Sequence, residues 1–307
     1  MENKNTTGRT LYIIGNGFDL AHDIKSSYKN YKEYYLSRKD VEKGFDIEMI
    51  FRKAEGDWSN IEEAIGEYDA DELRETIEPD EDAEEDDFTK QDELKSSCLQ
   101  HFFRNTINAL RTLFKEWVDR IDIRVKSKDK QYKFNNDDLF ITFNYTEVLE
   151  TIYGIPKSNI CYIHGRRRVD EEYIFGHNNE LPTITIPKEQ DYIGYIDIKK
   201  ELIDTMNDFV KPYEKCLGSI NQYLKKAKIE KVIVHGHSLG SVDRIYIERI
   251  VDIIEKHTPW EIDYYHEDEI DNIYRIKKEL ELTSVRVRCV DDKNEEYLKI
   301  ENIEDVY

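Results

Sequence analysis

The sequence predicts an α/β fold in which a mostly parallel sheet is flanked by helices, with a helical insertion after the first strand. Short apolar segments alternate with longer stretches whose apolar residues recur every three or four positions, as expected of strands and amphipathic helices in turn. Glycine, asparagine and histidine residues also gather where the predicted strands end. Parallel strands bring these ends to one edge of a sheet, where ligands bind.

The first predicted strand runs directly into a glycine turn. Residues 10–14 are mostly apolar, and Gly15-Asn16-Gly17 follows before a helix that begins near Phe18. Glycine suits a backbone that turns tightly or that a ligand approaches closely. The N-terminus of the following helix suits a phosphate, because its free N–H groups and positive dipole end face outward. The third glycine of the dinucleotide fingerprint is absent, so the turn alone predicts either a nucleotide site or a tight turn.

The helical insertion is expected to cover residues 20–130, within one α/β domain of residues 1–307. Its longest helical pattern runs from 94 to 123, where a broad apolar face suits either the core or an interface with a second copy of the chain. An acidic loop is expected at 78–93, because its run of Asp and Glu at 78–87 repels itself.

Strands and helices alternate again after the insertion, which is a Rossmann-like pattern. Strands are predicted at 139–143, 160–163, 173–175, 231–234, 261–265 and 284–290, and long helices at 197–227 and 242–256. Polar residues at the carboxyl ends of these strands are expected to share one cleft, namely Gly15, Asn16, Asn144, His164, His177, His237 and Ser238.

The composition restricts the partners of the chain. Its 307 residues carry a formal net charge of −21, which repels nucleic acid and anionic membranes at long range. The four cysteines lie far apart and form no C-x-x-C pair, so a structural zinc site is not expected. No secretory signal or membrane-spanning apolar run is visible, which predicts a cytoplasmic protein with no membrane partner.

The predicted cleft suits two kinds of chemistry. In a nucleotide cleft, Asn144 would orient a water or a ribose hydroxyl, because it carries both donors and an acceptor, and a histidine would transfer protons near neutral pH. Alternatively, residues 236–240 fit the G-x-S-x-G elbow of serine hydrolases, with Ser238 as the nucleophile. That alternative needs an acid and a histidine later in the chain, such as Asp263 with His257, and it leaves the earlier motifs unused.

Several short motifs follow one another along the chain: Ile14-Gly15-Asn16-Gly17-Phe18-Asp19-Leu20-Ala21-His22, Trp58 with Glu62, Phe143-Asn144-Tyr145-Thr146, Ile163-His164-Gly165, Gly176-His177-Asn178, and Gly236-His237-Ser238-Leu239-Gly240 with Asp243. In this order they resemble the AbiH family of bacterial proteins, which act in phage abortive infection. The resemblance implies antiphage defence that answers a phage trigger, without identifying that trigger or the chemistry.

A more distant resemblance implies a reaction. Sirtuin-like NAD-consuming proteins carry a Gly-Ala-Gly turn, a Thr-x-Asn strand end, a His-Gly and a Gly-Thr-Ser in the order that Gly15–Gly17, Thr142–Asn144, His164-Gly165 and 236–238 follow here. By this resemblance His164 is the base on the ribose hydroxyl. Asn16 replaces the family's small alanine, and the C-x-x-C zinc module of the deacylases is absent, so the resemblance implies NAD cleavage and not deacylation.

The leading hypothesis is therefore a sirtuin-like NAD hydrolase that uses NAD as its substrate and requires no cofactor or metal. Asn144 and His164 are its expected catalytic residues. Its expected nucleotide-binding residues are Gly15, Asn16, Gly17, Asp19, His22, Thr142, His177, Gly236, His237, Ser238 and Asp243. Two further hypotheses use the same cleft: a nuclease or phosphodiesterase whose histidines and aspartates hold a metal, and a nucleotide sensor without catalysis.

Overall fold

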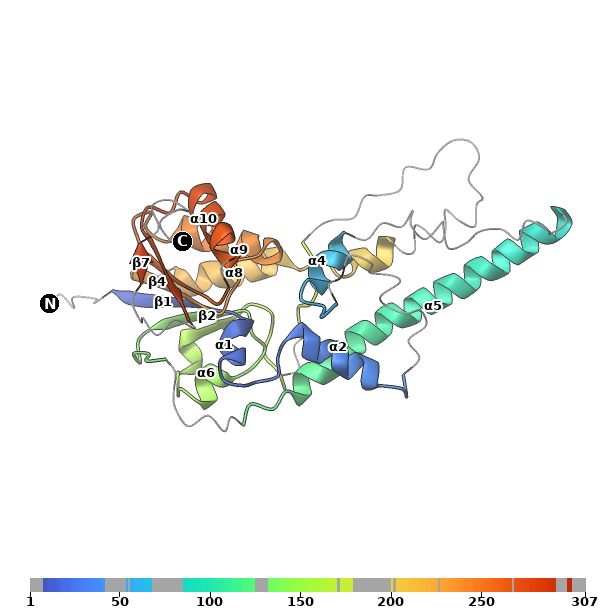
Figure 1. Cartoon of the computed structure of the whole chain (residues 1–307), viewed down its shortest axis with the longest axis horizontal. Coiled ribbons are helices and arrows are strands. Elements are labelled where there is room, and N and C mark those ends of the chain that lie inside the picture. The colour runs from blue at the N-terminus through green and yellow to red at the C-terminus, as the bar shows by residue number, and fades with distance from the viewer. Residues whose placement is uncertain are drawn as a thin grey trace. The chain divides into compact units, whose positions relative to one another are not determined.

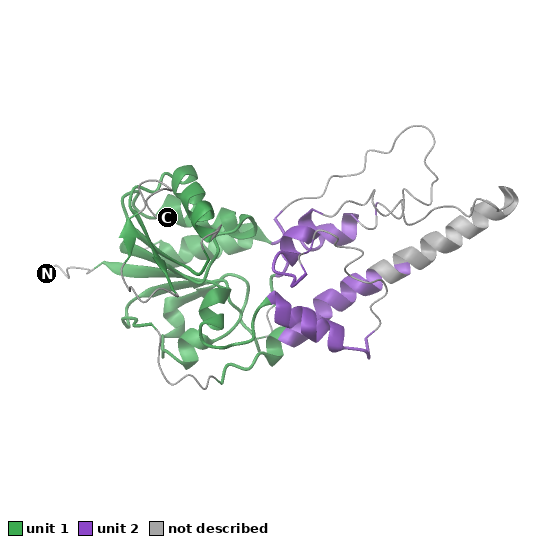
Figure 2. Ribbon diagram, in the orientation of Figure 1, with its two compact units in different colours: residues 1–27, 118–174, 212–307 green, residues 28–117, 175–211 purple. Residues whose placement is uncertain are grey.

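The computed structural model forms two compact units, each described by itself (Figure 2). The first unit comprises residues 1–27, 118–174 and 212–307, and the second comprises 28–117 and 175–211. The residues described are 8–41, 54, 56–67, 85–124, 132–169, 172–178, 200, 203–225, 227–266, 268–290 and 297–299, without the side chains of 85–100, 102, 103 and 268.

The first unit is built on a seven-stranded sheet in the order β3-β2-β1-β4-β5-β6-β7 (Figure 1). The strands are β1 (Arg9–Ile14), β2 (Leu139–Thr142), β3 (Ile160–Tyr162), β4 (Ile229–His235), β5 (Trp260–Tyr264), β6 (Val285–Cys289) and β7 (Leu298–Lys299). β1 to β6 run parallel and β7 is antiparallel to β6. The predicted α/β fold is confirmed, and its strand order reverses between β1 and β4, the point at which Rossmann-like sheets bind ligands.

Alternation along the central strands separates the two faces of the sheet. Leu11 and Ile13 of β1 pack into a core with α8 (Tyr213–Leu224), α9 (Arg244–Ile253) and α10 (Asp268–Glu279). Tyr12 lies on the opposite face and stacks on Phe140 of β2, with 5.0 Å between ring centroids. Successive side chains of a strand point to opposite faces of the sheet, and both faces of β1 are apolar because both faces of a parallel sheet are covered. Shorter elements complete the unit: α1 (Asn16–Leu20), α6 (Val148–Thr151), η2 (Lys157–Asn159) and η3 (Ser241–Asp243).

The second unit packs helices around aromatic side chains. It contains α2 (Tyr28–Ser37), α4 (Ile61–Gly66) and α5 (Glu85–Arg120) as far as Trp117. Tyr31 of α2 lies 5.6 Å from Trp58, and Phe114 of α5 stacks on Phe175 at 4.2 Å between ring centroids. Tyr31 and Tyr35 of α2 are therefore part of a core. None of the helices in the described part of the chain has both the length and the apolar character needed to cross a membrane.

Three predicted elements differ from the structure. Residues 173–175 form no strand, because the apolar side chain of Phe175 packs on Phe114 instead of within the sheet. The helix predicted over 197–227 is interrupted where Val210 bridges to His177, and α8 begins only after Pro212. In the predicted acidic loop, 78–84 lie outside the described residues and 85–93 belong to α5.

The C-terminus of α10 gives a first prediction about stability. Leu282 N–H donates to Lys277 O (2.9 Å) and Glu281 N–H to Lys278 O (3.3 Å), which is a Schellman motif. Glu281 takes a left-handed φ of 52° there, a conformation that costs a residue with a Cβ but not glycine. Glu281→Gly should therefore raise the free energy of unfolding by about 0.5–1 kcal/mol.

Chemical denaturation measures this gain, with Glu281→Ala as the matched control. The alanine variant also loses the distant contact with Lys256, whose side chain and that of Glu281 are both 82 % exposed, but it keeps the left-handed strain. A glycine variant no more stable than the alanine variant would contradict the assignment.

Candidate active site

Two glycine loops meet at the switch point between β1 and β4. The amides of Gly15 and Gly17 donate to the carbonyls of His235 (3.0 Å) and Gly236 (2.8 Å). A Cβ on Gly15 would lie 2.5 Å from the Gly236 carbonyl oxygen, and one on Gly17 would lie 2.7 Å from Gly236 Cα. Gly236 itself has a φ of 63°, which favours glycine. The glycines thus permit close packing of two backbones, and the two amides expected to face a phosphate already have protein partners.

Two other predicted nucleotide contacts also serve local structure. Asn16 Oδ1 accepts a hydrogen bond from Ser26 Oγ at 2.6 Å. His22 is buried, with Nδ1 2.7 Å from Phe18 O and Nε2 2.6 Å from Tyr153 OH. Burial lowers the pKa of His22, so the ring is neutral: Nδ1 donates to the carbonyl and Nε2 accepts from the phenol. Both nitrogens of His22 are therefore occupied.

His177 belongs to the second unit and is completely buried there. Its Nε2 lies 3.0 Å from Met206 O, and its backbone pairs with Phe209 and Lys211. An imidazole enclosed in this way has no surface for a ligand. That His177 shares a cleft with the first-unit residues therefore stays a prediction.

Asn144 is fixed by its amide nitrogen. Nδ2 donates to Gly15 O (3.0 Å) and to Asp19 Oδ1 (2.9 Å), while the backbone N–H of Asn144 donates to Thr142 Oγ1 (3.1 Å). The second carboxylate oxygen of Asp19 accepts from Thr146 Oγ1 at 2.6 Å. These contacts join the ends of β1 and β2. They give Asp19, Thr142 and Asn144, three residues of the predicted site, a structural role in holding these strand ends together.

The amide oxygen of Asn144 is left available. The terminal atom that contacts Gly15 O and Asp19 Oδ1 must be the nitrogen, because both partners only accept hydrogen bonds, and the other terminal atom of the amide is therefore Oδ1. No group in the described part of the chain donates to Oδ1, although Asn144 is only 7 % exposed. The side chain therefore presents a fixed hydrogen-bond acceptor from an otherwise buried position at the carboxyl edge of the sheet.

Asp19 carries a perturbed charge. Burial raises its pKa from 3.8 to about 6, and the hydrogen bonds from Thr146 and Asn144 and the charge of Arg167 only partly oppose that rise. Because the folded-state pKa of Asp19 is raised, the folded protein favours the protonated carboxyl group. The contribution of Asp19 to stability is therefore fully present below pH 4 and is lost as the pH rises through about 6. At neutral pH the buried carboxylate lowers the free energy of unfolding by about 3 kcal/mol.

Two histidines approach a single carboxylate beside this network. His164 Nε2 lies 3.3 Å from Asp243 Oδ1, and His237 Nε2 lies 3.6 Å from Asp243 Oδ2. The imidazoles are almost fully buried, whereas the Asp243 side chain is 19 % exposed. His164 follows β3, His237 follows β4 and Asp243 ends η3, so three segments of the predicted site converge here.

The ring of Phe143 holds the two imidazoles in place. Its centroid lies 5.4 Å from that of His164 and 4.3 Å from that of His237, with edge-on geometry in both cases. Leu239 N–H donates to His237 Nδ1 at 2.9 Å. Nδ1 is thus unprotonated, and the proton of His237 lies on Nε2, toward Asp243. Phe143 directly precedes Asn144, so the residue that packs against both imidazoles and the Asn144 acceptor follow the same strand, β2.

Ser238 lacks the geometry of an activated nucleophile. In the elbow of a serine hydrolase the serine itself takes the strained conformation, but here the positive φ angles belong to Gly236 and Leu239. The exposed Ser238 accepts from Asn272 through its carbonyl oxygen (2.7 Å), and among the described residues its hydroxyl makes no hydrogen bond to a histidine. The serine-hydrolase alternative thus gains no support.

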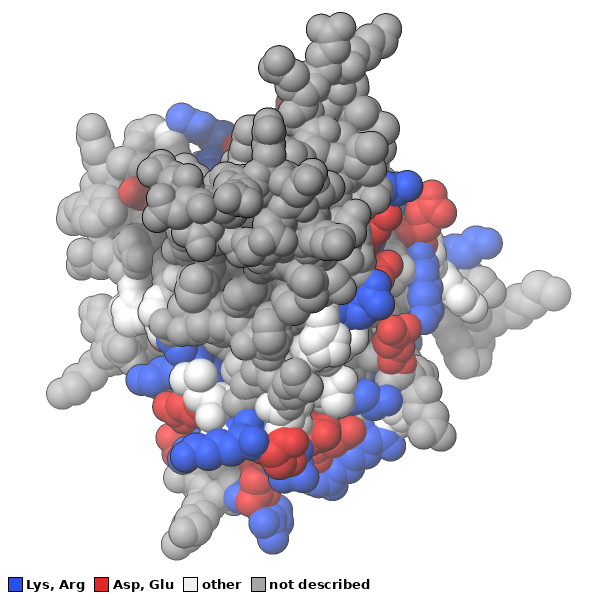
Figure 3. All heavy atoms as spheres, turned by 90° about the vertical axis from the view of Figure 1, so that its right-hand side faces the viewer, with Lys and Arg blue, Asp and Glu red and all other residues white. Residues whose placement is uncertain are grey.

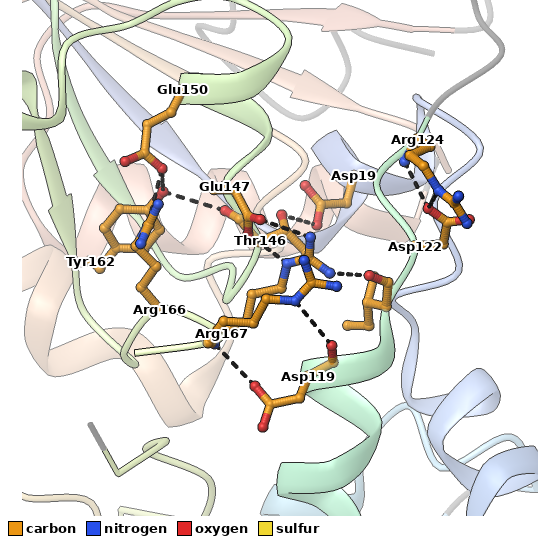
Figure 4. Close-up of polar contacts among 12 residues, drawn as sticks. Asp19, Asp119, Asp122, Arg124, Thr146, Glu147, Glu150, Tyr162, Arg166 and Arg167 are labelled. Atoms are coloured by element: carbon orange, nitrogen blue, oxygen red, sulfur yellow. Dashed lines mark hydrogen bonds and ion pairs between the residues drawn. The ribbon is translucent and has the colours of Figure 1, made fainter. Parts of the chain in front are cut away.

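An arginine–glutamate pair beside Asp19 was not found from the sequence. Arg167 is buried and makes two hydrogen bonds to the Glu147 carboxylate, and its third nitrogen donates to Ile121 O (Figure 4). Glu147 directly follows Thr146, and Arg167 closely follows His164. The position of each residue next to a short motif could have drawn attention to it. The sequence does not show, however, that a charged residue in one loop pairs with a charged residue in another.

A second polar network lies at the ends of β4, β5 and β6. His235 Nδ1 lies 2.6 Å from Asp263 Oδ2, and the same carboxylate accepts from Arg288 and from Tyr297 OH. Burial raises the pKa of Asp263, but His235 and Arg288 outweigh burial and hold that pKa below its usual value. This network joins three strands at neutral pH. No three His, Cys, Asp or Glu side chains within the described ranges are placed to hold a metal ion.

Comparison with known protein families matches residues 11–264 to the family described as Bacteriophage abortive infection AbiH. The chain belongs to the AbiH family. The match runs from β1 to β5 and includes every segment that supplies His164, His237, Asp243 and Asn144. No curated protein and no solved structure matches the chain.

Membership of the AbiH family assigns the chain to defence against phage by abortive infection. It confirms the resemblance of the sequence motifs to the AbiH family. The chemistry of this AbiH chain has to be argued from its own residues, and the reactive groups that gather at the carboxyl edge of its sheet are Asp243 with its two histidines and the Asn144 oxygen.

Proposed function

We propose that the chain is a hydrolase that cleaves the nicotinamide–ribose bond of NAD during phage infection. The observation that carries this proposal is the Asp243 carboxylate, which lies between His164 and His237 and remains partly open to solvent. The site lies near the point where the strand order reverses, the edge at which Rossmann-like sheets bind nucleotides.

The reaction needs a group that stabilises positive charge on the ribose. Breaking a glycosidic bond passes through an oxocarbenium-like state, which a nearby carboxylate stabilises, and we assign Asp243 to this role. Nicotinamide leaves with the electron pair of the broken C–N bond, and water forms the new C–O bond at the anomeric carbon. The proton released by the water passes to His164, whose imidazolium Asp243 stabilises.

Asn144 supplies orientation. Its free Oδ1 accepts a hydrogen bond, which suits the attacking water or a ribose hydroxyl. Because Nδ2 is held by Gly15 and Asp19, the oxygen is fixed before the substrate arrives. Fixed orientation of a reacting group is a large part of enzymatic rate enhancement. The glycine turn has no assigned contact with the pyrophosphate in this proposal.

A second candidate function rests on the same pair of histidines. Two imidazoles beside one carboxylate also suit metal-independent cleavage of an RNA phosphodiester, in which one ring accepts a proton and the other donates one. The charge distribution disfavours a long nucleic-acid footprint. On the face drawn in Figure 3, the Lys and Arg side chains of described residues are interspersed with Asp and Glu and form no continuous basic surface.

Release of nicotinamide from NAD by the purified protein tests the proposal. We expect release that a metal chelator leaves unchanged and that Asn144→Ala and His164→Ala reduce by about 10²–10⁴-fold. His257→Ala, at an exposed histidine, is the control and should retain full activity. Ser238→Ala should retain partial activity, because Ser238 is expected to contact the nucleotide but not to act as the nucleophile.

Cleavage of a short RNA, assayed with the same variants, separates the two candidates. RNA cleavage without nicotinamide release would reject NAD as the substrate and favour the phosphodiester reaction. Full antiphage protection by both Asn144→Ala and His164→Ala in cells would reject the site itself.

A further inference from the structure

The orientation of the Asn144 amide depends on two acceptors, one of which is an ionisable carboxylate. Nδ2 has two acceptors, Gly15 O and Asp19 Oδ1. Both select nitrogen over oxygen at that position, because a carbonyl and a carboxylate only accept hydrogen bonds. As long as Asp19 is ionised, Oδ1 is therefore the atom that the site receives.

Asp19 is itself held by a rigid support. Thr146 Oγ1 donates to Asp19 Oδ2 at 2.6 Å, and the next residue, Glu147, is clamped by Arg167 through two parallel hydrogen bonds (Figure 4). Arg167 is also bonded to Ile121 O. The segment that carries Thr146 is thus held by Arg167, from the loop after β3, and Arg167 is itself bonded to Ile121, in the chain that follows α5. Thr146 is therefore a fixed donor for the Asp19 carboxylate.

We propose that Asp19 is a positioning residue that, together with Gly15 O, fixes the Asn144 amide with its oxygen toward the substrate, and that protonation of Asp19 weakens this selection. A protonated carboxyl group donates a hydrogen bond, so Asn144 Oδ1 can turn inward to accept it in exchange for the Nδ2 bond to Gly15 O, and the site then receives an amide donor. The geometry stands without any substrate, whereas its effect on rate rests on the proposed function.

This device operates close to physiological pH. Burial places the pKa of Asp19 at about 6. Two charged groups face Asp19: Arg167 lowers its pKa and Glu147 raises it. Because these two side chains form an ion pair with each other, their opposite effects on Asp19 partly cancel. The other two contacts, Thr146 and Asn144, are neutral and favour the ionised form. We therefore expect the positioned state above about pH 6 and its loss below.

Side-chain amide NMR of Asn144 in the ¹⁵N-labelled full-length protein tests the geometry without any enzymatic assay. The Asn144 NH₂ signals, assigned by comparison with Asn144→Ala, should shift with a midpoint near pH 6 in the wild type and should not titrate in Asp19→Asn. Thr146→Val removes a hydrogen bond that favours the ionised form and should move the midpoint to higher pH. Asp23→Asn, at an exposed aspartate four residues from Asp19, should leave it unchanged.

The pH profile of nicotinamide release tests the consequence for the reaction. The wild type should lose activity below pH 6, and Asp19→Asn should have a lower rate without that acid limb, while its unfolding temperature above pH 6 exceeds that of the wild type. Asn144 signals that do not titrate between pH 5 and 8, or an acid limb retained in Asp19→Asn, would overturn the proposal. Titrating signals in a protein that releases no nicotinamide would uphold the positioning and reject NAD hydrolysis.

Discussion

Asp243→Asn should abolish antiphage protection and reduce nicotinamide release by about 10²–10⁴-fold. The substitution keeps the size of the side chain but removes the charge that lies 3.3 Å from His164 and 3.6 Å from His237. A neutral amide stabilises neither a developing positive charge on the ribose nor an imidazolium. Protection against phage in cells and the rate of release by purified protein measure the two effects.

Asp252→Asn is the matched control for Asp243→Asn. Asp252 lies on α9, soon after η3, and its 69 % exposed side chain only approaches Arg249. It should retain protection and rate. Thermal unfolding of both variants must stay close to that of the wild type for the comparison to be valid. A folded Asp243→Asn variant that keeps a rate within twofold of the wild type would reject Asp243 as the central group.

Arg167→Ala should produce the largest loss of stability. The Arg167 side chain is 1 % exposed, and it satisfies both oxygens of a Glu147 carboxylate that is itself 15 % exposed. Removing one partner of a buried ion pair leaves an uncompensated charge, which costs about 3–5 kcal/mol. The midpoint of thermal unfolding should fall by roughly 6–20 °C, as a first-unit domain of this size would show for that loss. Differential scanning calorimetry measures the shift.

Arg124→Ala is the control for Arg167→Ala. Arg124 also pairs with an acidic neighbour, Asp122, but their side chains are 89 % and 57 % exposed. Exposed pairs contribute little to stability, so this variant should unfold at almost the wild-type temperature. Joint replacement of Arg167 by Met and Glu147 by Leu should recover much of the loss, because it removes both buried charges. Similar destabilisation by Arg124→Ala and Arg167→Ala would contradict the argument from burial.

The parts of the fold that local pattern encodes were predicted correctly. The parallel strands β1 to β6 were found because apolar runs bounded by glycine or polar residues are typical of buried strands. Residues 173–175 show where this reasoning fails. A run of three apolar residues does not distinguish a strand from a segment that packs on a neighbouring helix, and the structure places Phe175 on Phe114.

The candidate site was predicted in part. Asn144, His164, His237 and Asp243 follow or precede predicted strands, so their gathering at one edge follows from parallel topology. The role of the glycines did not follow. Nothing local to Gly15 distinguishes a backbone that approaches a phosphate from one that approaches Gly236, which is more than two hundred residues away in the chain.

The sequence by itself determined the family, the α/β alternation and the edge of the sheet at which reactive residues gather. The tertiary structure alone decided which of those residues are available to a ligand. It enclosed His22 and His177, used the Gly15 and Gly17 amides, and turned the Asn144 oxygen into the free atom. Periodicity and turn chemistry are properties of neighbouring residues, whereas hydrogen-bond partners are set by the register and packing of distant segments.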